Sequence, residues 1–202
     1  RRVLFRSSFS VSETTEGVHI HIIDAELMGK GEKEKKDLYI EGVQNNGIIN
    51  HYEYIINSEG TIEIRHVLKP EGKMPLWFPR IGLTLTVSDA LDQVKWYGRG
   101  PQENYPDRKT GYPMGIYAST VQAMYEPYLM PQDYGLRTDV RWLQLTTDKG
   151  IGLQFKMNEW FNFNIYPYST DNLTKAMYTY QLQKQKGMTL NLDYATTEIG
   201  RA

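Results

Sequence analysis

The chain has 202 residues, a net charge of −1 and no cysteine. The balanced charge, without a long basic cluster, argues against nucleic-acid binding, because a phosphate backbone requires concentrated lysine and arginine. The absence of cysteine excludes disulfides, thiolate nucleophiles and cysteine-based metal sites. No apolar run approaches the roughly 20 residues that cross a bilayer and no signal peptide is recognisable, so we expect a soluble protein and no membrane partner.

The first half of the chain reads as a series of strands with turns between them. Asn45-Asn46-Gly47 and Ser58-Glu59-Gly60 are hairpin signals, because asparagine and glycine accept the positive φ of tight turns. The 15 tyrosines, 17 glycines and 9 prolines are also typical of short strands joined by tight turns. We therefore predict an all-β meander, with strands at residues 17–26, 38–44, 48–57, 61–68, 82–88 and 93–97.

A stiff polar loop follows the last of these strands. Residues 96–108 read WYGRGPQENYPDR. Pro101 and Pro106 fix φ and remove two backbone donors, so the polar side chains are carried on a loop that is ordered before anything binds. Such a loop can tie two sheets together or contact a substrate. The first role is favoured, because polar networks in loops more often stabilise the structure than contact a substrate.

The second half is predicted to be mostly strand as well. Ser169 or Thr170 is a suitable N-cap for a short helix over residues 169–176. Strands are predicted at residues 140–146, 152–157, 161–166, 178–183 and 188–194.

Two clusters of charged and titratable residues have plain structural explanations. His19 and His21 lie on one face of a strand, but no third metal ligand follows at a useful spacing, so a solvated strand face is preferred and no metal site is expected. The mixed-charge run at residues 32–36 is interpreted as a solvated hairpin tip.

Three blocks resemble the carboxy-terminal domain of large glycoside hydrolase family 2 β-galactosidases. They are WYGRGPQENYPDRKTG from Trp96, MYEPYLMPQDYGLRTDVRWLQL at residues 124–145, and GMTLNLDY at residues 187–194. The resemblance covers residues 17–197 and implies a large antiparallel β-sandwich of the galactose-mutarotase-like (supersandwich) kind. It also implies that the catalytic carboxylates lie in a separate (β/α)8 barrel.

The ends of the chain depart from that family. Residues 1–7 and 198–202 match translations of common sequencing adaptors, so we expect them to be non-native and the domain to span residues 8–197. The family's Gly-Gly-Asp-Asp-Ser-Trp type segment, whose tryptophan stacks on the sugar, and its upstream active-site loop have no match here. The sandwich is therefore expected to be incomplete at both ends.

The resemblance implies a retaining β-galactosidase, acting on terminal β-galactosides such as lactose through a covalent glycosyl-enzyme. This chain would be scaffold and active-site support, inactive alone, with the barrel as its partner in cis and the parent a homo-oligomer. Magnesium and sodium would belong to the barrel, and no cofactor is expected here. A bacterial cytoplasm and a periplasm both fit. The residues expected to organise the loop or lie near substrate are Trp96, Gln102, Glu103, Asn104, Tyr105, Asp107 and Arg108.

Two other functions stay open. A stand-alone carbohydrate-binding or mutarotase-like module would need a histidine and a carboxylate at one sugar, with His51 and His66 as candidates. An assembly domain would use exposed aromatic surface.

Glu103, Asp107 and Glu126 have the chemistry of a glycosidase pair, but the resemblance assigns that pair to the barrel. Most tryptophans are expected to be core, and Trp96, at the strand end, is the best candidate for sugar stacking.

Overall fold

The chain divides into two compact units, Arg1–Leu76 and Trp77–Ala202. A computed structural model describes residues 3–27, 47–72, 74, 78 and 80–196. The predicted strand at 38–44, the charge run at 32–36, most of the Asn45-Asn46-Gly47 turn and residues 198–202 lie outside the described residues. All four histidines belong to the first unit and all four tryptophans to the second.

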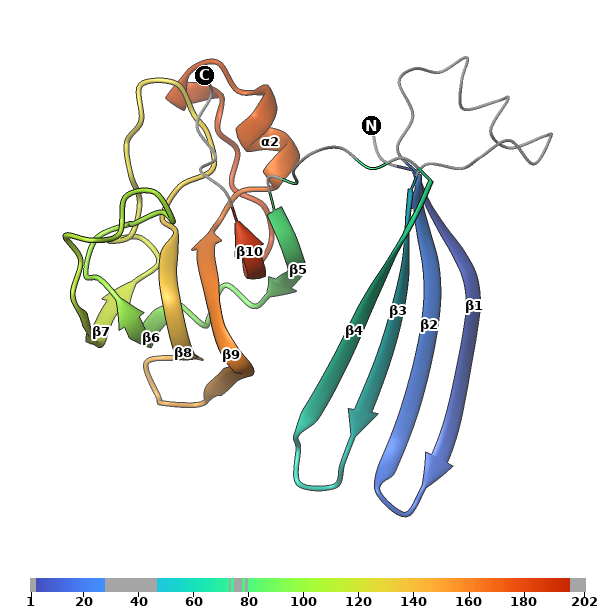
Figure 1. The fold of residues 1–202 in the computed structure, drawn as a ribbon. Coiled ribbons are helices and arrows are strands. Elements are labelled where there is room, and N and C mark those ends of the chain that lie inside the picture. The colour runs from blue at the N-terminus through green and yellow to red at the C-terminus, as the bar shows by residue number, and fades with distance from the viewer. Residues whose placement is uncertain (1–2, 28–46, 73, 75–77, 79, 197–202) are drawn as a thin grey trace. The chain divides into compact units, whose positions relative to one another are not determined.

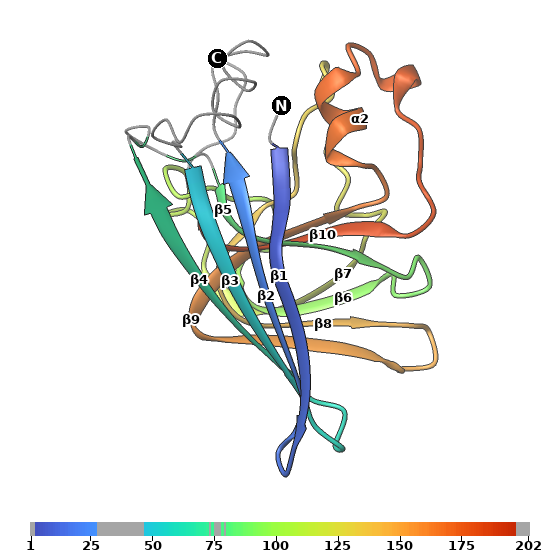
Figure 2. The same cartoon turned by 90° about the vertical axis from the view of Figure 1, so that its right-hand side faces the viewer.

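Unit 1, as far as it is described, is one antiparallel sheet whose strands pair in chain order (Figure 2). In the hairpin between β3 (Gly47–Ile56) and β4 (Ile62–Glu71), the Asn57 side chain accepts hydrogen bonds from the backbone N–H groups of Glu59 and Thr61, both at 3.0 Å. Gly60 adopts a φ of 82°, as the predicted hairpin signal requires. The strands are β1 (Val3–Thr14), β2 (Gly17–Leu27), β3 (Gly47–Ile56) and β4 (Ile62–Glu71).

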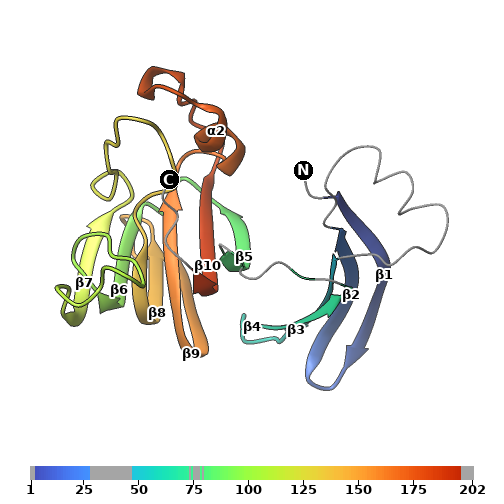
Figure 3. The same cartoon turned by 45° about the horizontal axis from the view of Figure 1, so that its top comes forward.

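Unit 2 contains a larger antiparallel sheet in the order β5-β10-β9-β8-β6-β7 (Figures 1 and 3). The last strand in the sequence, β10, lies between β5 and β9. The strands are β5 (Arg80–Val87), β6 (Gln93–Arg99), β7 (Met114–Thr120), β8 (Arg137–Thr146), β9 (Gly152–Tyr166) and β10 (Met188–Thr196).

The core of unit 2 is formed by large side chains from its central strands. Trp96 of β6, Leu143 of β8, Phe163 of β9 and Leu190 of β10 are all almost completely buried and belong to one cluster. Burying side chains of this size stabilises the unit by about 1.5–3 kcal/mol each, before the entropic cost of ordering them. A smaller cluster of Tyr134, Tyr166 and Leu173 anchors the only α-helix among the described residues, α2 (Thr170–Lys175).

The structure confirms the all-β, antiparallel fold class and most of the predicted strands. The helix is also confirmed, and Ser169 caps it by accepting a 3.1 Å hydrogen bond from the Asn172 N–H. Two antiparallel sheets are the building blocks of a β-sandwich. No helix in the described part of the chain has the length and apolar character to span a bilayer.

Two element predictions are wrong, and two strands were not predicted. Residues 178–183 are not a strand but contain the 3-10 helix η1 (Thr179–Gln181), because the Gln181 side chain accepts hydrogen bonds from the N–H groups of Met177 and Tyr178, at 2.7 and 3.1 Å. β9 is one continuous strand rather than two. The sequence pattern also predicts no strand where the structure has β1 and β7.

Candidate functional site

The polar loop predicted after β6 is the centre of an extensive side-chain network in the described part of unit 2. It begins at Gly100, which is joined to Pro101 by a cis peptide bond. A single β-bridge between Tyr105 and Arg108 then folds the chain back on itself. The loop is hydrogen-bonded to residues 128–138, in the segment that precedes and enters β8.

Glu103 is the hub of this network. Its side chain is 8% exposed, and each of its oxygens has two donors. Oε2 accepts from the Tyr105 hydroxyl at 3.1 Å and from the Gly135 N–H at 2.8 Å. Oε1 accepts from Arg108 Nη2 at 3.2 Å and from the Tyr128 hydroxyl. Four donors occupy the carboxylate, so it is held in place and has little capacity left for another partner.

The hydroxyls around Glu103 are poor acids. Burial, followed by the hydrogen bond and the charge of Glu103, raises the pKa of Tyr128 to about 12. Burial and the same carboxylate raise the pKa of Tyr105 further. Both tyrosines therefore remain protonated at neutral pH and act as hydrogen-bond donors to Glu103.

Asn104 ties the loop to the start of β8. The residue is completely buried. Its backbone N–H donates to the Leu136 carbonyl at 2.8 Å, and its side-chain oxygen accepts from both the N–H and the hydroxyl of Thr138. Its side-chain amide donates to the Gln102 carbonyl at 3.0 Å. These bonds fix the position of the loop relative to the sheet.

Trp96 is a core residue. It is 1% exposed, its indole N–H donates to the Arg99 carbonyl at 3.0 Å, and the Phe163 ring packs edge-on against it. The Arg137 guanidinium covers the ring at 5.4 Å from its centre. No free ring face is left for a sugar, so the suggestion that Trp96 stacks on one does not fit the structure.

Arg137 links Trp96 to the loop and was not singled out from the sequence. Its Nε donates to the Pro101 carbonyl at 3.0 Å and its Nη1 to the Gly135 carbonyl at 2.9 Å. Burial lowers the pKa of Arg137 to about 10. The residue stays charged at neutral pH. The sequence could have indicated Arg137 only through its position in the second of the three blocks that resemble the family.

A second ion cluster fixes the other side of the loop. Asp139 accepts from Arg99 Nε at 2.6 Å and from Lys109 Nζ at 2.8 Å. Burial alone would raise the pKa of Asp139, but the hydrogen bonds from Lys109 and Arg99 outweigh it and lower the pKa. Asp139 has a φ of 55°, in a bulged part of β8. This left-handed conformation is less costly for aspartate than for most residues.

A third cluster lies where β5, β9 and β10 meet. Arg80 Nη2 donates to Asp133 at 3.1 Å, and Arg80 Nε lies 2.9 Å from Oδ2 of Asp193. That second contact is an ion pair without good hydrogen-bond geometry, and neither Asp193 oxygen receives a well-aligned bond among the described residues. Burial raises the pKa of Asp193 to about 7. Asp193 is therefore a buried acid that titrates near neutrality.

The structure separates the residues predicted for the loop into two groups. Glu103, Asn104 and Tyr105 are buried within the network, together with Trp96, whereas Gln102, Asp107 and most of Arg108 face solvent. The sequence suggested Glu103, Asp107 and Glu126 as carboxylates with glycosidase chemistry. Partial burial and the charge of Glu103 raise the pKa of Glu126, but Glu103 is already occupied and Asp107 is exposed.

Close backbone packing under the loop gives a direct test of the geometry. A Cβ at Gly98 would lie 2.8 Å from Val140 Cγ2 and 3.0 Å from Val140 Cα. Gly98→Ala is therefore expected to lower the free energy of unfolding by about 1–3 kcal/mol. The matched control is Gly111→Ala, since a Cβ there has no neighbour within 4 Å. It should change stability by less than about 0.5 kcal/mol. Equal unfolding midpoints in urea for the two variants would contradict the packing described here.

Comparison with known proteins relates this chain to a family. The family described as "Beta galactosidase small chain" matches residues 8–202. A protein named beta-galactosidase from Priestia megaterium is 37% identical over 147 residues, which cover 73% of this chain and 14% of that protein. A beta-galactosidase from Vibrio cholerae is 38% identical over 122 residues, or 60% of this chain and 11% of its own. A beta-galactosidase from Pseudoalteromonas haloplanktis is 33% identical over 148 residues, which cover 73% of this chain and 14% of that protein. The chain thus matches 11–14% of the length of these relatives.

Proposed function

This chain belongs to the beta-galactosidase small chain family, and from this premise we propose that it is a scaffold region of a β-galactosidase. The parent would hydrolyse terminal β-galactosides such as lactose with retention, through a covalent glycosyl-enzyme on a separate barrel. The chain would contribute structure and support to the active site. Partners would be the barrel in cis and further copies of the parent, in a bacterial cytoplasm or periplasm. Any magnesium or sodium ion would be held by the barrel.

The occupied carboxylate of Glu103 is the observation that carries this proposal. A glycosidase needs one carboxyl group that exchanges a proton and another that attacks or activates water. Glu103 has four internal donors and no vacant side. A carboxylate held in this way positions a loop, as expected of a scaffold and not of an acid, base or nucleophile.

The mutarotase-like alternative is disfavoured by the register of unit 1. His51 pairs with Val67, and His66 pairs with Tyr52, the next residue along β3. Because successive residues of a strand point to opposite faces, His51 and His66 lie on opposite faces of the sheet. They cannot converge on one sugar. His66 is also engaged with Asn50 at 3.0 Å and stacked on Tyr52.

The isolated 202-residue chain provides the test. We expect no hydrolysis of lactose or of a chromogenic β-galactoside, and no saturable change in tryptophan fluorescence on titration with galactose or lactose. A saturable change would favour a carbohydrate-binding module, and hydrolysis would place a catalytic site in this chain. In the source DNA, the reading frame should continue upstream into a (β/α)8 barrel. Genuine start and stop codons at the two ends would contradict the proposal.

A further inference from the structure

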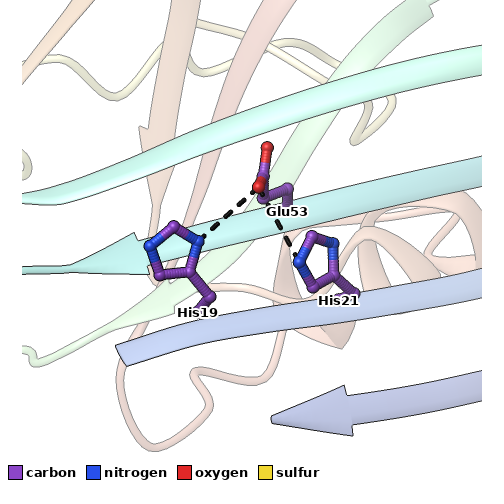
Figure 4. A group of neighbouring side chains, drawn as sticks. All are labelled: His19, His21 and Glu53. Carbon is purple, nitrogen blue, oxygen red and sulfur yellow. Dashed lines mark ion pairs between the residues drawn. The ribbon is translucent and has the colours of Figure 1, made fainter. Parts of the chain in front are cut away.

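Two histidines and a glutamate come together on one face of the unit 1 sheet. His19 and His21 are two residues apart in β2 and so share a face. Glu53 of β3 is paired directly opposite His21. Figure 4 shows the two rings and the carboxylate turned toward one another. Oε1 of Glu53 lies 3.7 Å from His19 Nδ1 and 3.7 Å from His21 Nε2.

The neighbouring strand holds the carboxylate in this orientation. Arg65 of β4 is paired with Glu53, and its Nη1 donates to Oε2 at 3.1 Å. Arg65 is itself held by a 2.8 Å bond from its Nε to Glu63. The outer oxygen of Glu53 is therefore occupied, and Oε1 is left facing the histidines. A ligating carboxylate is commonly oriented in this way by a partner on its second oxygen.

We propose that His19, His21 and Glu53 form a binding site for a divalent transition-metal ion, with zinc as the best fit. The sequence offered no third ligand near the two histidines, but the register of the sheet brings Glu53 to them from the next strand. Two imidazole nitrogens and one carboxylate oxygen suit zinc, whereas magnesium and calcium prefer all-oxygen sites. The site goes beyond the scaffold function and does not depend on it.

The distances are close to those of a bound site. Zinc bonds of about 2.0–2.1 Å in a tetrahedron put the ligand atoms about 3.4 Å apart. The two contacts to Glu53 exceed this by a few tenths of an ångström, and the three ligand atoms lie within 4.8 Å of one another. Binding of an ion would require the side-chain torsions to change until all three ligand atoms reach these separations.

The surroundings of the three side chains leave a path for a metal ion and a fourth coordination position on it. The His19 side chain is 14% exposed, that of Glu53 26% and that of His21 50%. An ion can therefore approach from the His21 side and keep a water as its fourth ligand. The second nitrogen of His19, Nε2, is buried without a hydrogen-bond partner in the described part of the chain, so no competing bond turns Nδ1 away from Glu53.

Cobalt is a suitable first probe, because its visible d–d bands report tetrahedral coordination and it occupies zinc sites. The full 202-residue chain, without an affinity tag, is titrated with Co²⁺ and then with Zn²⁺ or Mg²⁺. We expect one Co²⁺ per chain, displaced by Zn²⁺ and not by Mg²⁺. Zinc should also raise the thermal unfolding midpoint followed by far-UV circular dichroism, since an ion bound to the folded form stabilises it.

A pair of matched variants tests the assignment. His21→Gln and His51→Gln each remove one of the four histidines, but only the first removes a proposed ligand. His21→Gln should weaken Co²⁺ binding by at least about 100-fold, and His51→Gln should leave it unchanged. Glu53→Gln, which keeps size and polarity, should weaken binding in the same way and provides an independent measurement if His21→Gln unfolds.

Two results would overturn the proposal. One is the absence of saturable cobalt bands in the wild-type chain. The other is the same affinity in His21→Gln and Glu53→Gln as in the wild type. Either would leave the three side chains as a cluster of close polar contacts on the face of the sheet.

Discussion

Glu103→Gln is expected to lower the free energy of unfolding of unit 2 by about 3 kcal/mol, although the two side chains have the same shape. The carboxylate accepts two donors on each oxygen. Glutamine replaces one oxygen with an amide that is itself a donor, so two of the four donors would meet a donor. Breaking a buried, charged hydrogen-bonded group costs more than losing a neutral bond.

Urea unfolding followed by tryptophan fluorescence measures this loss of stability in unit 2, because all four tryptophans belong to that unit. Glu126→Gln is the matched control, since this half-buried glutamate feels the charge of Glu103 and makes no side-chain hydrogen bond among the described contacts. Removing its charge should be neutral or slightly stabilising. If Glu103→Gln is as stable as Glu126→Gln, the four-donor network does not hold the loop.

The second large effect is a dependence of stability on pH, caused by Asp193. An aspartate in an unfolded chain has a pKa of about 3.9, and burial raises that of Asp193 to about 7 in the folded state. Between these values the folded chain keeps a proton that the unfolded chain has released. The contribution of Asp193 to stability is therefore full below about pH 4, falls as the pH rises to about 7, and is constant above that.

Asp193→Asn replaces the acid with a neutral mimic of its protonated form. Relative to the wild type, its free energy of unfolding should rise by about 2.6 kcal/mol between pH 5 and pH 8. Arg80 keeps its second partner, Asp133, in this variant. Denaturation of both proteins at the two pH values measures the difference. Asp171→Asn is the control, because this exposed helix residue should show no such rise. A constant difference between Asp193→Asn and the wild type would mean that Asp193 is not a neutral acid in the fold.

The strands that the sequence predicted are those whose apolar residues alternate or cluster strongly. The runs that became β2, β4 and β10 carry this signal, and their positions are correct to within a few residues. β7 lacks it, because it is an edge strand with large exposed side chains such as Ile116. The break predicted inside β9 fell at Asn158 and Glu159, where polar residues interrupt an apolar run. In the structure this stretch lies at a shift of register with β8, between Lys156 and Phe161, and β9 continues beyond it to pair with β8 and β10.

Of the candidate site, the sequence predicted the residues of the loop and not the partners that they bind. The prolines and glycines of residues 96–108 predict an ordered polar loop, and this loop contains Glu103 and Asn104. Their partners Tyr128, Gly135 and Thr138 come from a segment more than 20 residues later, and no local pattern indicates which of its groups will meet the loop. For the same reason Glu53 could not be matched to His19 and His21, since pairing between strands depends on a register that neither strand specifies alone.

The place of β10 in its sheet has a consequence for how the protein is made. β5 pairs with β10, and Thr84 of β5 bonds to Asn191 across 107 positions of the sequence. At a synthesis rate of about 5–20 residues per second, β5 leaves the ribosome about 5–20 s before its neighbour exists. During that interval its hydrogen-bonding edge is open to other nascent chains, and unpaired edges seed aggregation. The yield of folded protein in a cell should therefore depend on translation speed and on chaperones that shield the early strands.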